Sequence, residues 1–205
     1  MNLNRNQIIL FLSSLFALFI TATFAQNTDI NLLREINQSG NNRSINFTQV
    51  VSDSTSVIVF STMLILLGLS FFKRNRSLRD QSFLLIVSVL VADGLSSLIK
   101  IIVQRQRPFE TYLDIIKYGD GGSFSFPSGH TTEAFAFATA ISLAYRKWYI
   151  VVPAYLWACL VGFSRIHLGT HYPSDVVAGI LVGTGCSFLC FKTVQWYQKR
   201  KKSFL

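Results

Sequence analysis

The sequence predicts an all-α protein, a multi-pass transmembrane helix bundle of five spans that follow an N-terminal signal peptide or sixth span. Half of the 205 residues are hydrophobic and only 14% are charged, whereas about a quarter of an ordinary soluble domain is charged. Long uncharged runs alternate with short clusters of Lys and Arg, which is typical of membrane helices and their loops. This composition argues against a soluble single-core enzyme and excludes a disordered chain, a collagen and a disulfide scaffold.

The first element is a hydrophobic segment at residues 1–25. Arg5 precedes an apolar stretch from Ile8 to Ile20, and Thr23-Phe24-Ala25 ends the segment. This pattern fits a secretory signal peptide, and equally well an uncleaved first transmembrane helix. Either alternative exports the polar segment that follows, residues 26–54, which is rich in Asn and Ser.

Five further spans are expected in a membrane domain of residues 55–195, which a basic cytoplasmic tail follows at residues 196–205. Several spans are shorter than the roughly 20 residues that a full crossing prefers. Local thinning of the bilayer and aromatic residues at the span ends accommodate such lengths. The expected spans are about Thr55–Phe72, Ser82–Val103, Thr131–Tyr145, Trp148–Phe163 and Val176–Phe191.

The distribution of charge predicts the orientation of the bundle. Lys and Arg are retained on the cytoplasmic side of short loops, and twelve of the 19 basic residues flank apolar runs with only one acid, Asp80, among them. The bilayer therefore explains the net charge of +9 better than nucleic acid does. The two longer polar connections, residues 104–130 and 164–175, then lie outside. The twelve basic residues are Arg5, Lys73, Arg74, Arg76, Arg79, Arg146, Lys147, Lys192, Lys199, Arg200, Lys201 and Lys202.

The cysteines and histidines do not predict a metal site, and no cofactor is expected. Cys159, Cys186 and Cys190 all lie inside apolar stretches, where they fit small packing residues. His167 and His171 have the spacing of two zinc ligands, but no third ligand is evident nearby.

Lys100 and Arg107 are the first candidate binding residues. Their spacing predicts two helical turns, which places both side chains on one face, about 10 Å apart along the axis, and directs Arg105 elsewhere. Pro108 marks a break in the helix. Two cations on one face suit an anion with several oxygens, because Arg binds phosphate in a bidentate manner. The alternative is that both side chains extend to the membrane interface, and for this pair taken alone that explanation is the favoured one.

A glycine-rich loop from Gly119 to His130 leads directly into the apolar run that begins at Thr131. Unpaired backbone N–H groups at such a helix start form an anion site, and Gly129 allows close approach of the backbone. His130 at its edge is placed to donate a proton to a leaving oxygen. The alternative is a flexible connector with an incidental histidine.

The second polar connection contains His171 and Asp175, four residues apart, with Pro173 suited to the first turn of the next helix. If that turn forms, the carboxylate can hold one imidazole nitrogen and leave the other free as a nucleophile. The alternative is that Asp175 only complements the helix dipole.

Together these motifs resemble the three-part signature of the type 2 phosphatidic acid phosphatase family, which is related to the vanadium haloperoxidases. Every specified position is filled, in order, and the surrounding helices extend the resemblance over about residues 50–195. The three parts are Lys100-x6-Arg107-Pro108, Pro127-Ser128-Gly129-His130 and Ser164-Arg165-x5-His171-x3-Asp175.

The resemblance implies a metal-independent phosphatase that acts through a phosphohistidine. In this scheme His171 attacks phosphorus, Asp175 orients His171, and His130 protonates the leaving group. The groups that the resemblance assigns to the phosphoryl oxygens are Lys100, Arg107, Arg165 and the backbone near Ser128 and Gly129.

A site at the outer edge of a bilayer suits a lipid whose phosphate lies in the headgroup layer. The resemblance thus implies a lipid phosphatase of a bacterial inner (cell) membrane with its site facing the periplasm. Undecaprenyl diphosphate and lipid A are the favoured substrates, with phosphatidic acid and phosphatidylglycerol phosphate as alternatives. Two hypotheses from other classes are a vanadate-dependent haloperoxidase, against which the spans argue, and a non-catalytic membrane protein, against which the intact motifs argue.

Two acids remain near these motifs. Asp93 lies seven residues before Lys100, and as an intramembrane acid it is expected to face the bundle interior, where it either assists the site or makes a structural hydrogen bond. Glu133, one turn after His130, either supports the site residues or complements the start of a helix, and the second interpretation is the favoured one.

Overall fold

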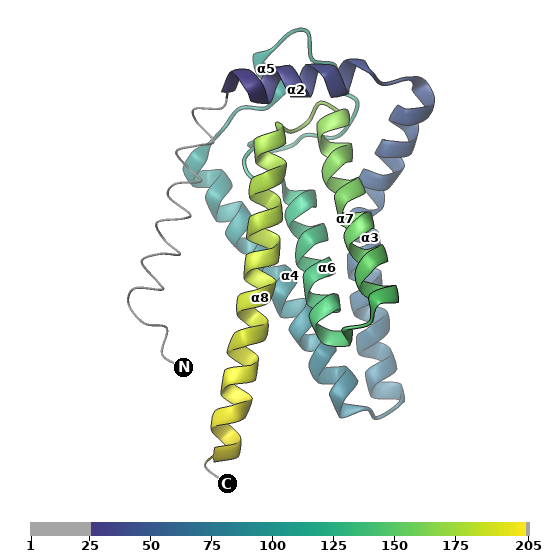
Figure 1. The fold of residues 1–205 in the computed structure, drawn as a ribbon, viewed down its shortest axis with the longest axis vertical. Coiled ribbons are helices and arrows are strands. Elements are labelled where there is room, and N and C mark those ends of the chain that lie inside the picture. Colours follow the sequence, from purple (N-terminus) through teal and green to yellow (C-terminus); the bar gives the residue numbers. More distant parts are fainter. Residues whose placement is uncertain (1–25, 204–205) are drawn as a thin grey trace.

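The computed structural model describes residues 26–203, which form an all-helical bundle without strands. In Figure 1 the long helices run side by side, and α2 lies across one end of the bundle. The hydrophobic segment at residues 1–25 lies outside the described residues. The helices are α2 (Gln26–Gln38), α3 (Asn42–Phe72), α4 (Arg76–Val103), α5 (Pro108–Thr111), α6 (Gly129–Tyr145), α7 (Trp148–His167) and α8 (Pro173–Ser203).

The expectation of an all-α, multi-pass membrane bundle is confirmed. Within residues 26–203, four helical segments are long and apolar enough to cross a membrane. The fifth expected span corresponds to α6, whose 17 residues lie in the middle of the bundle, with residues 131–140 all buried. The four segments are Asn42–Phe72, Arg76–Thr111, Trp148–His167 and Pro173–Tyr197.

Helix α3 begins well before the expected start of its span at Thr55. Asn41 caps it, because its side chain accepts from the backbone N–H of Ser44 at 2.9 Å, and the Ser44 hydroxyl accepts in return from the N–H of Asn41. Part of the polar segment 26–54 is therefore helical. The buried polar residues Thr48 and Ser52 on its first turns face other parts of the protein instead of lipid.

The ends of the other helices also have local causes. The Asn75 side chain accepts from the N–H of Leu78 at 3.1 Å and so starts α4. Helix α4 ends where Gln104 adopts the left-handed conformation, with φ of 51°. Pro108 and Pro173 occupy the first positions of α5 and α8, where their missing N–H groups are not needed.

Small residues let α8 approach α6 closely. A Cβ built on Gly179 would lie 2.8 Å from the carbonyl oxygen of Ser128, and one on Gly183 would lie 2.8 Å from the backbone nitrogen of Ala136. The Ser187 hydroxyl, on the same helix, donates to the Ala136 carbonyl at 2.8 Å. In lipid the hydrophobic effect does not drive helices together, so their association depends on close backbone packing and hydrogen bonds of this kind.

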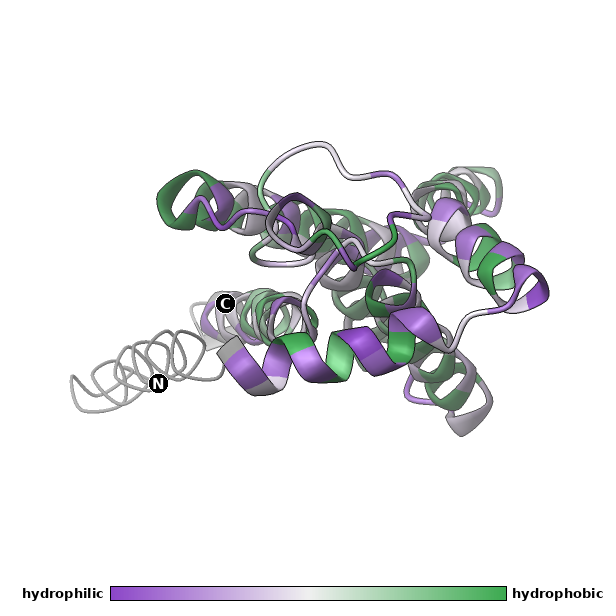
Figure 2. Cartoon of the chain, turned by 90° about the horizontal axis from the view of Figure 1, so that it is seen from above, coloured by the Kyte–Doolittle hydropathy of each residue, from purple (hydrophilic) through white to green (hydrophobic). Residues whose placement is uncertain are grey.

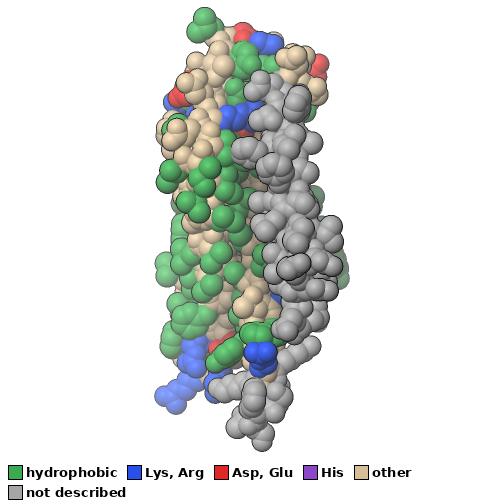
Figure 3. Space-filling model, turned by 90° about the vertical axis from the view of Figure 1, so that its left-hand side faces the viewer, with side chains coloured by type: hydrophobic (Ala, Val, Ile, Leu, Met, Phe, Trp, Pro, Cys, Tyr) green, Lys and Arg blue, Asp and Glu red, His purple; other side chains and the backbone are tan. Residues whose placement is uncertain are grey.

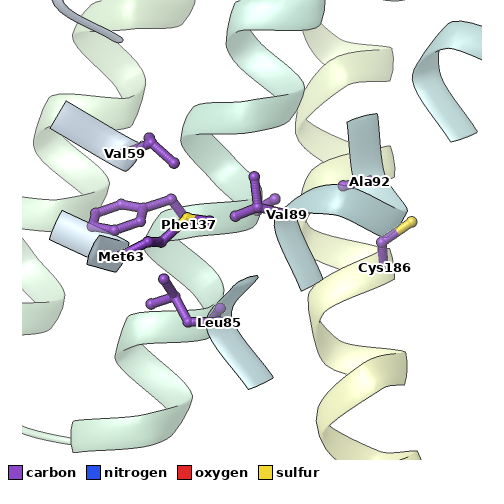
Figure 4. Close-up of a cluster of buried hydrophobic side chains, with 9 residues drawn as sticks. Val59, Met63, Leu85, Val89, Ala92, Phe137 and Cys186 are labelled. Carbon is purple, nitrogen blue, oxygen red and sulfur yellow. The ribbon is translucent and has the colours of Figure 1, made fainter. Parts of the chain in front are cut away.

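A hydrophobic cluster joins α6 to three of its neighbours in the middle of the bundle. Its side chains come from α3, α4, α6 and α8 and interdigitate in Figure 4. Phe137 of α6 also packs edge-on against Trp157 of α7, with ring centroids 5.9 Å apart. The cluster consists of Val59, Met63, Leu85, Val89, Ala92, Ala136, Phe137, Ala140 and Cys186.

The two ends of the bundle differ. The turns at residues 73–75 and 146–147 and the C-terminal end of α8 all lie toward the end opposite α2 (Figure 1). Figure 3 shows hydrophobic side chains over the middle of one face and Lys and Arg gathered at this lower end. The connections that carry the candidate site residues lie at the other end, beneath and beside α2.

Helix α2 is amphipathic and crosses the end of the bundle, as the mixed colours of this helix in Figure 2 show. It buries Ile30 and Leu33 against Ile115 and Tyr172. Because those two partners belong to the loops that surround the candidate site, α2 forms part of its outer wall.

Candidate active site

The candidate residues gather at the end of the bundle that carries α2. They come from the end of α4 and the connection after it, the start of α6, the end of α7, the connection from α7 to α8, and the first turn of α8. Backbone hydrogen bonds join these segments: the N–H of Ser128 donates to the Asp175 carbonyl at 3.0 Å, and the N–H of Ser125 donates to the Arg105 carbonyl at 2.8 Å. Loops far apart in the sequence are thereby held in one layer.

His171 lies at the centre of this layer and is only 2% exposed. Its Nε2 accepts from Nη1 of Arg107 at 3.3 Å, so the lone pair of Nε2 points toward a cation. Its Nδ1 lies 3.5 Å from Oδ2 of Asp175. At this distance the two atoms do not form a hydrogen bond in the described part of the chain. The tautomer with its proton on Nδ1 would face the carboxylate and leave the lone pair of Nε2 free to act as a nucleophile.

Asp175 is fully buried and stands in the first turn of α8. Its Oδ2 accepts from the backbone N–H of Tyr172 at 2.9 Å and from the Ser125 hydroxyl. Its Oδ1 accepts from Nη1 of Arg105 at 2.7 Å. A carboxylate with this many donors remains ionised even where water is excluded.

Two buried arginines line the same space. Arg107 donates from Nε to the Ser123 carbonyl at 2.6 Å and from Nη1 to the Thr170 carbonyl at 2.9 Å. Arg165, 2% exposed, donates to the Ser52 hydroxyl and to the Asp120 carbonyl at 2.8 Å, but its buried Nε has no acceptor within the described residues. A buried guanidinium N–H without an acceptor is costly, unless an anion binds there.

The Lys100 side chain reaches the start of α6. Among the described residues, a Cβ built on Gly129 would meet only Cε of Lys100, at 4.0 Å. The Lys100 ammonium donates to the Phe124 carbonyl at 2.8 Å and retains two further N–H bonds for a ligand. An anion bound at the start of α6 would therefore lie within reach of this cation.

Ser128 does not offer its backbone amide to a ligand, because that N–H is committed to the Asp175 carbonyl. The expectation of an amide contribution is therefore wrong for Ser128. The free N–H groups of the first helical turn belong to Gly129 and the residues that follow it. The Ser128 side chain is buried, and its hydroxyl accepts from Thr131 at 2.8 Å.

Both site histidines lie outside the four candidate spans, and both are neutral in this environment. Burial lowers the pKa of His171 to about 3, although the neighbouring Asp175 acts in the opposite direction. Burial also lowers the pKa of His130 to about 4, and the positive charges of Arg165, Arg107 and Lys100 lower it further. His130 therefore lies within the electrostatic reach of all three cations.

Two expectations about the helix end are wrong. Lys100 and Arg107 do not lie two turns apart on one helix, because α4 ends at Val103 and Gln104 turns the chain. They face one space because the loop at residues 119–128 receives hydrogen bonds from both. Arg105 does not point away from the site but binds Asp175 directly.

Glu133 is not a solvated acid at a helix start. It is 7% exposed, its Oε2 accepts from Ser56 of α3 at 2.8 Å, and its Oε1 has no partner within the described residues.

His167 is a structural residue: its Nδ1 pairs with the Thr48 hydroxyl at 3.0 Å and its ring stacks on Phe163. The described residues contain no group of three or more His, Cys, Asp or Glu that could hold a metal ion.

Sequence reasoning missed several residues that shape the site. Ser52 of α3 and Ser125 of the long loop each bind a charged site residue, and Asp29 of α2 binds Arg105 at 2.9 Å. A short amphipathic pattern marks α2 as a helix, but no pattern along the sequence indicates which buried charge it reaches.

The fold and the site define a membrane-spanning helix bundle with a buried histidine–aspartate pair surrounded by cations. The chain belongs to the PAP2 superfamily, whose family model matches residues 81–199. It is similar to an undecaprenyl-diphosphatase of Sulfolobus acidocaldarius, with 35% identity over 122 residues, which are 58% of this chain and 56% of that relative.

Two further comparisons agree with this assignment. A lipid A 1-phosphatase of Rhizobium etli is 31% identical over 152 residues, which are 67% of this chain and 64% of that relative. The chain thus spans less than two thirds of the length of either relative. Among solved structures, LpxE of Aquifex aeolicus is 28% identical, with a TM-score of 0.71 over 80% of this chain and 95% of that one.

Proposed function

We propose that this protein is a membrane lipid phosphatase that hydrolyses a lipid phosphomonoester or diphosphate through a phosphohistidine on His171. The observation that carries the proposal is the position of Nε2 of His171, which lies 3.3 Å from Nη1 of Arg107 in a buried layer of cations. A nucleophile placed beside anion-binding groups is what phosphoryl transfer requires.

In the first step Nε2 of His171 attacks phosphorus, and the P–O bond to the lipid breaks. Arg107, Arg165 and Lys100 neutralise charge on the phosphoryl oxygens. The buried Nε of Arg165, which has no acceptor in the described part of the chain, is a donor prepared for one of them. Asp175 holds the proton on Nδ1 and stabilises the positive charge that develops on the ring.

His130 supplies the proton that the leaving oxygen takes up. In the free protein three cations oppose protonation of this residue. A bound phosphoryl group brings negative charge among the same cations and raises the pKa of His130, so substrate and proton bind together. In the second step His130 takes a proton from water as that water attacks phosphorus, the P–N bond breaks, and phosphate leaves.

The substrate class follows from the location of the site at one end of membrane-spanning helices. A lipid headgroup reaches such a site while its chains remain in the bilayer. The printed names of the two relatives, an undecaprenyl-diphosphatase and a lipid A 1-phosphatase, favour undecaprenyl diphosphate or lipid A. The Lys and Arg residues at the opposite end (Figure 3) support a site that faces the periplasm of an inner membrane.

The test is phosphate release by the purified full-length protein in detergent with EDTA. The lipid panel contains undecaprenyl diphosphate, lipid A, phosphatidic acid and phosphatidylglycerol phosphate. We expect release by the wild-type protein, no release by His171→Ala, and a phosphorylated histidine trapped at His171 by acid-free quenching and mass spectrometry.

His167→Gln is the matched control, because it alters a buried histidine four residues away that contacts Thr48 and Phe163 instead of the cations. It should retain activity if it retains the fold, which its elution in size-exclusion chromatography checks. Release that persists in His171→Ala, or halide oxidation with vanadate and peroxide without any release, would contradict the proposal.

A further inference from the structure

We propose that Asp29 is a positioning residue that acts through Arg105 to fix the carboxylate of Asp175, and with it the ring of His171. Asp29 lies on α2, outside the residues 81–199 that the family model matches. The inference rests on the proposed function, because it takes His171 as the nucleophile. It assigns to α2 a part in the chemistry of the site.

Asp29 is buried although it belongs to a surface helix. Only 5% of it is exposed. Its Oδ1 accepts from the backbone N–H of Ser174 at 2.8 Å, and its Oδ2 accepts from Nη2 of Arg105 at 2.9 Å and from the Ser174 hydroxyl. Both oxygens are thus used by the segment that starts α8, one residue before Asp175.

Arg105 joins the two buried carboxylates. Its Nη1 donates to Oδ1 of Asp175 at 2.7 Å and to the Ser174 hydroxyl at 2.7 Å, while its Nη2 donates to Asp29. The guanidinium carbon lies 3.7 Å from the centroid of the Tyr172 ring. A planar guanidinium held on two edges and one face has a single orientation available.

In this orientation the two oxygens of Asp175 have different partners. Oδ1 is occupied by Arg105, whereas Oδ2 faces Nδ1 of His171 at 3.5 Å and accepts from Tyr172 and Ser125. Loss of the Asp29 contact would free one edge of the guanidinium. Arg105 could then rotate, and the carboxylate would turn with it and release His171.

Helix α2 is held firmly enough to transmit this constraint. At its far end the Asn37 side chain donates to the carbonyls of Ile116 and His167, both at 3.0 Å, and accepts from the N–H of Ile116 at 3.0 Å. Leu33, between Asn37 and Asp29, is fully buried. The position of Asp29 is therefore set by contacts that do not involve the catalytic groups.

The experiment measures kcat and KM for phosphate release from undecaprenyl diphosphate by full-length Asp29→Asn protein in detergent. We expect kcat to fall about 10- to 100-fold, as is usual when a residue that orients a reacting side chain is lost. KM should stay within about twofold, because Asp29 does not contact the substrate. Arg105→Lys keeps the positive charge but lacks the two guanidinium nitrogens that bind Asp175 and Asp29, so it should show the same fall in kcat. It replaces Asp29→Asn in the test if that variant does not fold.

Asp114→Asn is the matched control. It removes the carboxylate of another aspartate–arginine pair that ties α2 to a loop, since Nε of Arg34 lies 2.6 Å from Oδ2 of Asp114, but this pair is exposed and has no link to Asp175. Its kcat should equal that of the wild type. The double variant Asp29→Asn/Arg105→Gln should be no slower than Arg105→Gln alone, and a further independent loss would contradict action through Arg105.

A second measurement does not depend on turnover. In the substrate-free protein the Nδ1 proton resonance of His171, observed by nuclear magnetic resonance, should move upfield in Asp29→Asn as its contact with Asp175 weakens. An unmoved resonance, or a kcat within about twofold of an active wild type, overturns the positioning role and leaves the proposed function standing. A wild type that releases no phosphate from any lipid contradicts the proposed function, and the resonance then decides the role of Asp29 alone.

Discussion

At the scale of single residues, His171 combines a neutral ring with a strongly charged environment. Burial opposes a positive charge on the ring, while Asp175 favours it. The burial effect is the larger one, so the free protein holds a deprotonated Nε2 beside Arg107. In the proposed mechanism the same carboxylate becomes useful once the ring gains a phosphoryl group, because the positive charge then has a partner at 3.5 Å.

The first prediction concerns protonation of His171. Because its pKa is lowered to about 3, the neutral form persists as the pH falls, and the ring should not titrate between pH 8 and pH 5. Nuclear magnetic resonance of histidine-labelled protein, with the signal assigned through His171→Gln, measures this directly. A midpoint near the ordinary histidine value of about 6.5 would contradict the burial argument.

The same shift predicts a sign for stability. The unfolded chain takes up a proton at this position at about pH 6.5, whereas the folded protein resists it down to about pH 3. The contribution of His171 to the free energy of unfolding is therefore complete above pH 6.5 and decreases as the pH falls through this window. His171→Gln should remove that part of the pH dependence.

At the scale of elements, α6 and α8 act as one unit. The first carries His130 and the second Asp175, and their N-terminal ends are joined by the hydrogen bond from Ser128 to the Asp175 carbonyl. Gly179 and Gly183 allow the two backbones to touch over the next turns. The distance between His130 and His171, the proposed proton donor and nucleophile, thus depends on helix packing well below the site.

A bulky residue at Gly183 should separate these helices. Its Cβ would overlap the Thr132 carbonyl and lie 2.8 Å from the Ala136 nitrogen, and both atoms are rigid backbone. Gly183→Leu should cost about 1–3 kcal/mol of stability and reduce kcat through displacement of His130. Thermal unfolding in detergent and the phosphate-release assay measure the two effects.

Gly185→Leu, on the same helix, is the control, because a Cβ there meets nothing within 4 Å among residues 26–203. It should leave both the unfolding midpoint and kcat near the wild-type values. Equal behaviour of the two leucine variants would show that close contact between α6 and α8 does not set the geometry of the site.

At the scale of the whole molecule, the two ends of the bundle carry different kinds of charged residues. The end with α2 holds the buried charges, and the end with the turns at 73–75 and 146–147 carries exposed Lys and Arg. Retention of basic loops in the cytoplasm then predicts the orientation of every helix. A lipid phosphate would reach the site from the outer leaflet.

Cysteine labelling tests this orientation. With the three native cysteines replaced by Ala, Leu113→Cys at a fully exposed loop position and Lys147→Cys at the opposite turn provide one reporter for each end. In spheroplasts a membrane-impermeant maleimide should label Leu113→Cys at once and Lys147→Cys only after permeabilisation. The reverse pattern would place the site in the cytoplasm.

Much of this protein follows from patterns along the sequence, because those patterns are local. Hydrophobic length predicts the helices, and Pro173 predicts the start of α8 that brings Asp175 toward His171. Helical spacing failed for Lys100 and Arg107, since the left-handed Gln104 ends α4 between them. A single residue with a left-handed backbone conformation produces no periodic pattern in the sequence, so the helix end could not be recognised from spacing.

The sequence by itself determined the all-helical membrane class, the basic end of the bundle and the motif residues that form the candidate site. Only the tertiary structure decided which donors each buried charge receives: Arg105 and Ser125 for Asp175, Ser52 for Arg165, and Asp29 for Arg105. The reason is physical. The partners of a buried charge are set by tertiary packing, and here they lie on segments up to 113 residues apart in the sequence. Helical periodicity relates only residues that are close in the sequence, so it cannot identify such partners.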